Sequence, residues 1–365
     1  MKVYKSYHYK LKLTKVQAET VDQWLGTCRY VYNLALETKI AAWQKGVTLS
    51  KFDLFKQLPT LKDIDWIKTV PSQSLYAVIE RLDAAYNKFF SGGGFPKWAK
   101  KSEYNSMIFK LPEQTANGFK LPKLGNVKIF KDRMPNGKLK TANIVKNRNN
   151  YYLGVTFESE SQNIYPTDKN QVVGLDMGLA YFLTDSNGIF IKNPKHFKKY
   201  ETKLRIKNRA LVRKKKGSNG YKKAKLELKR LYEKITSTRK DFLNKVSFKY
   251  VRENTLIVSE ELKVSNMAKN TSLAKYIYDA GWGNFFLMLD YKCKYYEKTF
   301  VQVKPHYTSQ TCNACGYVAK ENRVTQSIFK CVQCGHGENA DYNAAKNILG
   351  QGMALVRQRE GLPCA

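Results

Sequence analysis

Four cysteines near the carboxyl end of the chain have the spacing of a metal site. Cys312 and Cys315 form one C-x2-C pair, and Cys331 and Cys334 form a second pair after an interval of fifteen residues. Each pair presents two sulfurs from a tight turn, and two pairs complete the tetrahedron that zinc prefers. Four free thiols or two disulfides are the alternative interpretation. Since four sulfurs leave no open coordination position, we predict one structural Zn²⁺ ion without a catalytic role.

Three carboxylates lie in or beside apolar segments. Asp176 stands inside the run VVGLDMG, and Glu260 and Glu261 end the run that begins with TLIVS. Asp341 opens the helical segment DYNAAKNIL. Considered one at a time, the acids have alternative explanations: Asp176 as a turn residue and Asp341 as a helix N-cap. Together, acids on two core strands and one helix can meet at one edge of a sheet and hold two Mg²⁺ ions. Such a pair of ions stabilises the attacking water and the leaving 3′ oxygen in phosphodiester hydrolysis.

The charge of the chain indicates a polyanionic partner. The 365 residues include 64 Lys and Arg against 30 Asp and Glu, which gives a formal net charge of +34. Such an excess favours nucleic acid binding, with a merely well-solvated surface as the alternative. The 43% hydrophobic residues exclude wholesale disorder. We find no apolar run of about 18 residues and no signal peptide, so we expect a cytosolic protein without a membrane partner.

The first half of the chain predicts a β domain interrupted by helices. Residues 3–13 alternate like a strand, and Thr14 and Gln17 have the spacing of a capping box that starts a helix. A second apolar stripe predicts a helix from about Pro71 to Phe90, which ends at a run of glycines that we interpret as a cap and linker. Further strands are predicted at MIFKL, NVKIF and YYLGVTF.

The second half has the element order of an RNase H-like fold. VVGLDMG predicts a buried strand, and AYFLTDSNGIFI predicts a hairpin that turns at residues 185–188. A basic helical stretch follows, and residues 192–252 contain 23 Lys and Arg and 4 Asp and Glu, so 23 − 4 = +19. Helices with this charge are expected to bind along the backbone of a nucleic acid duplex. The alternative for part of the segment 214–223 is a solvated loop.

The motifs in combination resemble the TnpB family of transposon-encoded, RNA-guided DNA nucleases, which are related to the compact type V CRISPR effectors. The likeness covers essentially the whole chain. It rests on GLDMG, IVSEELKVSNM, TSQTCNACG, NRVTQSIFKCVQCG and NADYNAAKNIL, with CRYVYN and GFPKW nearer the N-terminus.

The resemblance implies that Asp176, Glu260 and Asp341 are the catalytic ligands of Mg²⁺. The family's E-D-L segment reads Glu260-Glu261-Leu262 here, so Glu260 aligns with the family's acid and Glu261 replaces an aspartate. Arg323 lies between the cysteine pairs, where the family also has an arginine, and either contacts phosphate or is exposed to solvent.

The resemblance further implies an α+β multidomain fold. Residues 1–13 and 95–165 would form a split, β-barrel-like wedge domain, and residues 14–94 a helical recognition insertion. Residues 166–305 and 339–365 would form an RNase H-like (RuvC) α/β nuclease domain. The inserted zinc ribbon, residues 306–338, would bind target nucleic acid.

The expected activity is RNA-guided cleavage of double-stranded DNA in a prokaryotic cytoplasm, at the nucleoid. A monomer would carry one guide RNA from the transposon end, read a transposon-adjacent motif and cut by two-metal hydrolysis. One alternative is a DNA transposase or recombinase of RNase H-like fold. Another is an RNA-guided repressor with a silent nuclease core, which would be marked by the loss of one acid, whereas all three acids are present.

Overall fold

The computed structural model describes residues 2–130, 134–148, 150–162, 165, 168, 171–269 and 271–359. The chain divides into two compact units, Met1–Glu160 and Ser161–Ala365. Across these described ranges, no helix is both long enough and apolar enough to cross a membrane.

Unit 1 contains an antiparallel sheet of seven strands in the order β2-β6-β7-β1-β5-β4-β3. The first strand of the chain lies in the middle of this sheet, because β1 pairs with β7 on one side and with β5 on the other. The strands are β1 (Lys2–Lys12), β2 (Ser106–Lys110), β3 (Glu113–Thr115), β4 (Gly118–Leu121), β5 (Gly125–Ile129), β6 (Lys138–Asn147) and β7 (Asn150–Glu160).

Four helices lie between β1 and β2 in the sequence: α1 (Lys15–Gln44), α2 (Lys51–Leu61), α3 (Asp65–Lys68) and α4 (Ser72–Phe90). Helix α1 begins with the predicted capping box, in which the Gln17 backbone N–H donates to Thr14 Oγ1 over 3.2 Å and the Thr14 N–H donates to Gln17 Oε1 over 3.1 Å. Buried side chains of α1 and α4, such as Trp24 and Leu82, share one core with Phe109 of the sheet.

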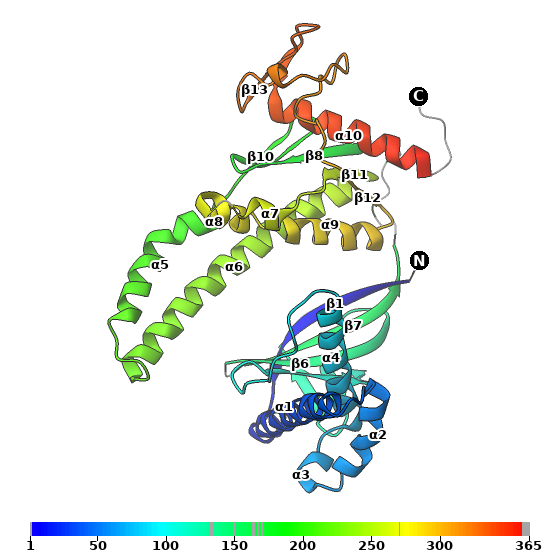
Figure 1. Ribbon diagram of the computed structural model, residues 1–365, viewed down its shortest axis with the longest axis vertical. Coiled ribbons are helices and arrows are strands. Elements are labelled where there is room, and N and C mark those ends of the chain that lie inside the picture. Colours follow the sequence, from blue (N-terminus) through cyan, green and yellow to red (C-terminus); the bar gives the residue numbers. More distant parts are fainter. Residues whose placement is uncertain are drawn as a thin grey trace. The chain divides into compact units, whose positions relative to one another are not determined.

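Unit 2 contains a mixed sheet of five strands in the order β10-β9-β8-β11-β12 (Figure 1). Strand β9 is antiparallel to both of its neighbours, whereas β8, β11 and β12 are parallel. The strands are β8 (Val172–Met177), β9 (Tyr181–Asp185), β10 (Phe190–Lys192), β11 (Leu256–Glu260) and β12 (Thr299–Val303).

Helices cover both faces of this sheet. One face packs against α6 (Asn219–Glu253), α8 (Thr271–Ala280) and α9 (Trp282–Tyr295), and the other face packs against α10 (Ala340–Arg359). The side chains alternate accordingly: Val173, Leu175 and Ile257 belong to the first core, and Val258 belongs to the core beneath α10. Strands buried on both faces are apolar throughout, which explains the unbroken runs in the sequence.

Two smaller parts complete unit 2. Helix α5 (His196–Val212) and the first half of α6 form an antiparallel hairpin, held by a small core that includes Leu204, Leu228 and Ile235 (Figure 1). Between β12 and α10, the cysteine region contains a short 3-10 helix, Lys320–Asn322, and the hairpin of β13 (Ile328–Lys330) and β14 (Gly337–Asn339). A short helix α7 (Val264–Met267) follows β11.

The mixed α/β character predicted for the chain is confirmed, with two large sheets and a cysteine cluster. The end of a helix at Phe90 and the hairpin around residues 185–188 are also confirmed. The assignment of wedge, recognition, nuclease and ribbon domains, with the bounds given above, stays a prediction.

Candidate active site and metal centre

Asp176 and Glu260 lie side by side at the ends of adjacent parallel strands. Strand β11 pairs with β8 up to Ser259 and Leu175, so Glu260 and Asp176 are the next residues along the two strands. Because side chains alternate along a strand, both acids fall on the face that α10 covers, together with Val258. Asp176 is therefore a strand residue, and its interpretation as a turn residue is wrong.

The third acid, Asp341, lies in the first turn of α10. The side chain that caps this helix belongs to Asn339, whose Oδ1 accepts hydrogen bonds from the backbone N–H groups of Asp341 at 3.0 Å and Tyr342 at 3.2 Å. Since Asn339 satisfies these donors, the Asp341 carboxylate is not needed as an N-cap. The alternative interpretation of Asp341 as the N-cap of the helix is therefore wrong.

The three acids line one pocket of about 340 Å³, together with Arg323 from the cysteine region and with the loop between β12 and that region. An Arg323 guanidinium nitrogen lies 3.6 Å from Asp341 Oδ1, and the same guanidinium donates to the Gln326 carbonyl at 3.0 Å. The pocket thus combines three carboxylates with one cation, and it lies at the carboxyl ends of the parallel strands.

The electrostatics of the pocket favour a bound cation. Burial raises the pKa of Asp176 well above its ordinary value, and the negative charges of Glu260 and Asp341 raise it further, against the opposing effect of Arg323. Burial also raises the pKa of Asp341, again opposed by Arg323. These carboxyl groups therefore resist ionisation unless positive charge enters the pocket.

The structure distinguishes the two adjacent glutamates. Glu260 lines the pocket, and its carboxylate accepts a hydrogen bond from Thr308 Oγ1. Glu261 is exposed and is not among the residues that line the pocket. Its backbone N–H donates to the Val303 carbonyl at 2.8 Å, which continues the pairing of β11 with β12.

The residues fit Mg²⁺ in the chemistry of their donors. All three anionic side chains offer oxygen, the atom that Mg²⁺ prefers, and the pocket has room for the water that Mg²⁺ normally retains. Among the residues that the structure describes, however, only the cysteines bring three or more ligand atoms within 4.8 Å of one another. The acids therefore line a common site but are not gathered into a closed cage.

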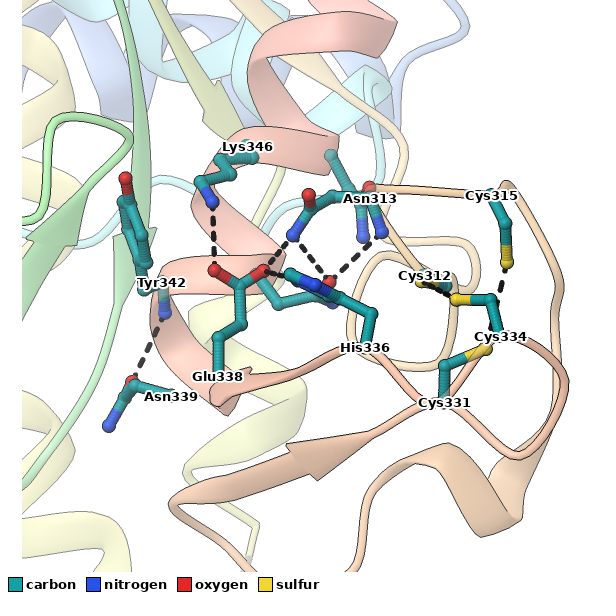
Figure 2. Close-up of polar contacts among 12 residues, drawn as sticks. Cys312, Asn313, Cys315, Cys331, Cys334, His336, Glu338, Asn339, Tyr342 and Lys346 are labelled. Carbon is teal, nitrogen blue, oxygen red and sulfur yellow. Dashed lines mark hydrogen bonds and ion pairs between the residues drawn. The ribbon is translucent and has the colours of Figure 1, made fainter.

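The four predicted cysteines form a compact cluster (Figure 2). The sulfur atoms of Cys312 and Cys334 are 3.7 Å apart, and those of Cys315 and Cys331 are 3.6 Å apart. Tetrahedral bonds of about 2.3 Å from zinc to sulfur place neighbouring sulfurs roughly 3.8 Å apart. The geometry therefore suits a Zn²⁺ ion.

The two cysteine pairs have the same backbone turn. In the first, the Gly316 N–H donates to the Cys312 carbonyl at 2.9 Å, and in the second the Gly335 N–H donates to the Cys331 carbonyl at 3.0 Å. Both glycines have a positive φ, +77° and +71°, which other residues adopt only at a cost. The buried side chain of Asn322 joins the pairs, because it donates to the Tyr317 carbonyl and accepts from the Val332 N–H.

A polar network connects the first cysteine turn to α10 (Figure 2). Asn313 donates from its backbone N–H to Asn343 Oδ1 at 3.0 Å, and from its side chain to both Asn343 and Glu338. Lys346 Nζ donates to Glu338 at 2.8 Å, and His336 Nε2 lies 3.1 Å from the same carboxylate. The cysteine cluster is thereby fixed to the helix that carries Asp341.

The basic segment forms the hairpin of α5 and α6. Glu201, Glu227 and Asp241 each pair with a lysine, but four acids can balance only a small part of 23 basic side chains. The five lysines of segment 214–223, which covers the end of the α5–α6 connection and the first turn of α6, are exposed.

Sequence reasoning missed the polar residues around the acids, above all Thr308, Asn343 and Asn347. The loop residue Thr308 carries no periodic signal. The asparagines are recognisable only through their spacing of four, which places both on one side of a helix.

Known families and proteins match this chain over nearly its whole length. A family model named OrfB_IS605 and described as "Probable transposase" matches residues 155–271, and a model described as "Cas12f1-like, TNB domain" matches residues 282–348. A third, described as "Helix-turn-helix domain", matches residues 1–47. Within this range the structure has β1, Lys2–Lys12, and one continuous helix, α1, Lys15–Gln44.

Two relatives match over almost their full length. A protein of Escherichia coli (strain K12), named for an inferred activity as RNA-guided DNA endonuclease InsQ, is 32% identical over 98% of this chain and 94% of its own. A Streptomyces pristinaespiralis protein, also named for inferred RNA-guided DNA endonuclease activity, is 29% identical over 99% of this chain and 92% of its own. The solved Cas12f1 complex with single guide RNA and target DNA shares the fold, with a TM-score of 0.65 at 13% identity over 92% of this chain and 83% of that protein.

Proposed function

The chain belongs to the TnpB family, and on this basis we propose that it is a transposon-encoded, RNA-guided endonuclease that cleaves double-stranded DNA. The observation that carries the proposal is the pocket in which Asp176, Glu260 and Asp341 come together from two core strands and one helix. The three acids in one pocket, together with relatives that match 98–99% of the chain, support a phosphodiester hydrolase.

In this proposal Asp176, Glu260 and Asp341 hold two Mg²⁺ ions. When bound, such ions activate the attacking water and stabilise the leaving 3′ oxygen. The chain's own residues would hold and orient the acids, and Arg323 would neutralise the scissile phosphate. A guanidinium suits this role because it forms paired hydrogen bonds to phosphate oxygens.

The four cysteines would hold a structural Zn²⁺ ion. Because all four positions of the tetrahedron are filled by sulfur, the ion has no position for water or substrate. Its contribution is to fold the region that carries Arg323 and to attach it to α10 through Asn313.

The guide RNA would come from the transposon end, and the target would be DNA next to a transposon-adjacent motif. Base pairing with the guide would read most of the target, while the protein reads the short motif and the shape of the backbone. The net charge of +34 and the exposed lysines near the α5–α6 turn support binding to a nucleic acid backbone. We further propose that one monomer carries one RNA.

The test begins with the RNA. The protein is purified from cells that carry its native flanking DNA, and the bound RNA is sequenced. One defined RNA that ends in sequence from beyond the element is the expected result, and a plasmid library with random flanks then identifies the adjacent motif. Glu260→Ala should abolish cleavage, whereas Glu261→Ala, its exposed neighbour, should cut like the wild type. Random cellular RNA in place of one defined species contradicts the guided function.

A transposase is the second candidate, favoured by the description of the matched family model. Such an enzyme would bind transposon ends by sequence and join DNA strands without RNA. An assay with labelled element ends separates the two functions, because a joined product formed without RNA supports the transposase, and a cut that depends on the guide supports the endonuclease.

A further inference from the structure

Helix α10 holds the loop that follows β12 through two asparagines one turn apart. Asn343 is fully buried, and its Nδ2 donates to the Thr311 carbonyl at 2.8 Å. Asn347 Nδ2 donates to the carbonyls of Thr308 at 2.9 Å and Thr311 at 2.7 Å. A spacing of four residues places both amides on one side of the helix.

The same loop reaches the active site through Thr308. Only 4% of Thr308 is exposed, and its hydroxyl donates to the Glu260 carboxylate, while its carbonyl is held by Asn347. A continuous chain of hydrogen bonds therefore runs from Asn347 through Thr308 to Glu260. Asp341 and Asn347 belong to the same rigid helix, so one element both carries the third acid and holds the second.

We propose that Thr308 and Asn347 are positioning residues for the metal site, with Asn343 supporting the same loop. This inference rests on the proposed function, because it concerns the same three acids. Glu260 lies beside Asp176 and in the same pocket as Asp341, so three carboxyl groups share a small volume in which like charges would repel one another. A donor that fixes the Glu260 carboxylate holds it in place for the incoming ion. Groups that orient ligands in this way commonly contribute about 10- to 100-fold to metal affinity.

The matched substitutions are Thr308→Val and Thr308→Ser. Valine keeps the branched shape of threonine but removes the hydroxyl, whereas serine keeps the hydroxyl. Asn347→Asp keeps the shape of the amide but removes both N–H donors. Gln351→Ala is the control on the same helix, since Gln351 is a further turn along and its contact to the His306 carbonyl, at 3.4 Å, is longer than an ordinary hydrogen bond.

Metal binding is measured with Mn²⁺, which prefers the same oxygen ligands as Mg²⁺ and is detected free in solution by electron paramagnetic resonance. The full-length, zinc-loaded protein is titrated without RNA, since RNA itself binds Mn²⁺, and the binding that survives in Asp176→Ala is subtracted. We expect Thr308→Val and Asn347→Asp to raise the Mn²⁺ dissociation constant about 10- to 100-fold. Thr308→Ser and Gln351→Ala should stay near the wild-type value, and zinc content should be unchanged in all variants.

Cleavage by the RNA-loaded enzyme gives the second measurement. The Mg²⁺ concentration for half-maximal cleavage should be higher in Thr308→Val than in the wild type. In Thr308→Ser it should be near the wild-type value. Wild-type Mn²⁺ affinity in Thr308→Val overturns the inference. If Asn347→Asp loses zinc or fails to fold, Thr308→Val decides alone. If Asp176→Ala binds Mn²⁺ as the wild type does, the proposed metal site itself is wrong. That result contradicts the proposed function, whereas wild-type affinity in Thr308→Val contradicts only the positioning role.

Discussion

Gly174 of β8 lies directly against the backbone of α10 at Ala345, so that a Cβ on Gly174 would stand 2.2 Å from the Ala345 carbonyl oxygen. A second glycine, Gly352, meets Val258 of β11 in the same way, with a Cβ 2.3 Å from a valine methyl group. At both glycines, therefore, helix and sheet are too close together for a side chain in place of the glycine hydrogen. Because Asp341 lies one turn before Ala345, this spacing also sets the distance between Asp341 and Asp176.

Gly174→Ala should lower both stability and cleavage. The added methyl group has no space, and overpacking of this kind typically costs about 1–3 kcal/mol. The helix must also move away from the sheet and take Asp341 with it. Urea unfolding measures the loss of stability, and plasmid cleavage under saturating Mg²⁺ measures the loss of activity.

Gly350→Ala is the matched control, since nothing lies within 4 Å of the position that its Cβ would take. An alanine inside a helix is about 0.5–1 kcal/mol more favourable than glycine. We therefore expect a small gain in stability and unchanged cleavage. A Gly174→Ala enzyme as stable and active as Gly350→Ala would show that the close contact has no role in positioning Asp341.

Asp176→Asn should abolish cleavage and stabilise the protein in the absence of Mg²⁺. The pKa of Asp176 is raised in the folded state, first by burial and then by Glu260 and Asp341. A group whose pKa is higher in the folded than in the unfolded protein contributes its full stabilisation at a pH below its unfolded-state pKa. This contribution is lost as the pH rises through the higher, folded-state pKa. Because the asparagine amide of the variant carries no charge, the variant does not lose stability in this way. It should therefore be more stable than the wild type at a pH above the range in which aspartate ordinarily ionises.

Thermal unfolding from pH 4 to 8 measures this effect, in a buffer free of Mg²⁺ but without a chelator that would remove zinc. The advantage of Asp176→Asn should grow with pH and shrink when Mg²⁺ is added to the wild type. Glu261→Gln, on the exposed neighbour, should leave the pH profile unchanged. An advantage that does not depend on pH would show that ionisation of Asp176 is not the cause.

Cys312→Ser should lower the zinc content and loosen the cysteine region. Elemental analysis is expected to find one zinc per wild-type chain and less in the variant. Thiol titration gives an independent test, because burial raises the pKa of Cys28 to about 12 and of Cys293 to about 12, which makes both unreactive in the folded protein. Release of zinc should therefore expose only the four clustered thiols among these six cysteines. Unchanged zinc content in Cys312→Ser would refute the site.

Replacing Lys214, Lys215 and Lys216 with glutamine should weaken RNA binding. Each phosphate contact that is lost should reduce the slope of log affinity against log salt by about 0.7–0.9. Filter binding over a range of salt concentrations measures both quantities, and the triple arginine variant, which keeps the charge, is the control. Affinity and slope equal to those of the wild type would identify the segment as a solvated loop.

Much of the frame of the active site follows from local sequence patterns. The capping box at Thr14, the apolar run around Asp176 and the cysteine spacing each report a short-range preference, and the structure contains all three features. Alternation within a strand even assigns Asp176 and Glu260 to a common face once their strands are known to be neighbours.

What could not be predicted depends on contacts between distant segments. The need for glycine at position 174 arises from Ala345, which is far away in the sequence. The hydroxyl of Thr308 matters because of Glu260 on another strand, and no periodicity marks it. Strand β6 was also outside the predicted strands, since its charged and polar residues hide its alternation.

The central position of β1 in its sheet has a consequence for how the protein is made. Ser6 and Thr156 face each other across 150 residues of sequence, so β1 leaves the ribosome long before β7 exists. At about 5–20 residues per second, the wait lasts roughly 8 to 30 s. During this time α1 to α4 can fold, while β1 keeps open edges. Its exposed lysines, Lys2, Lys10 and Lys12, oppose pairing with another nascent chain.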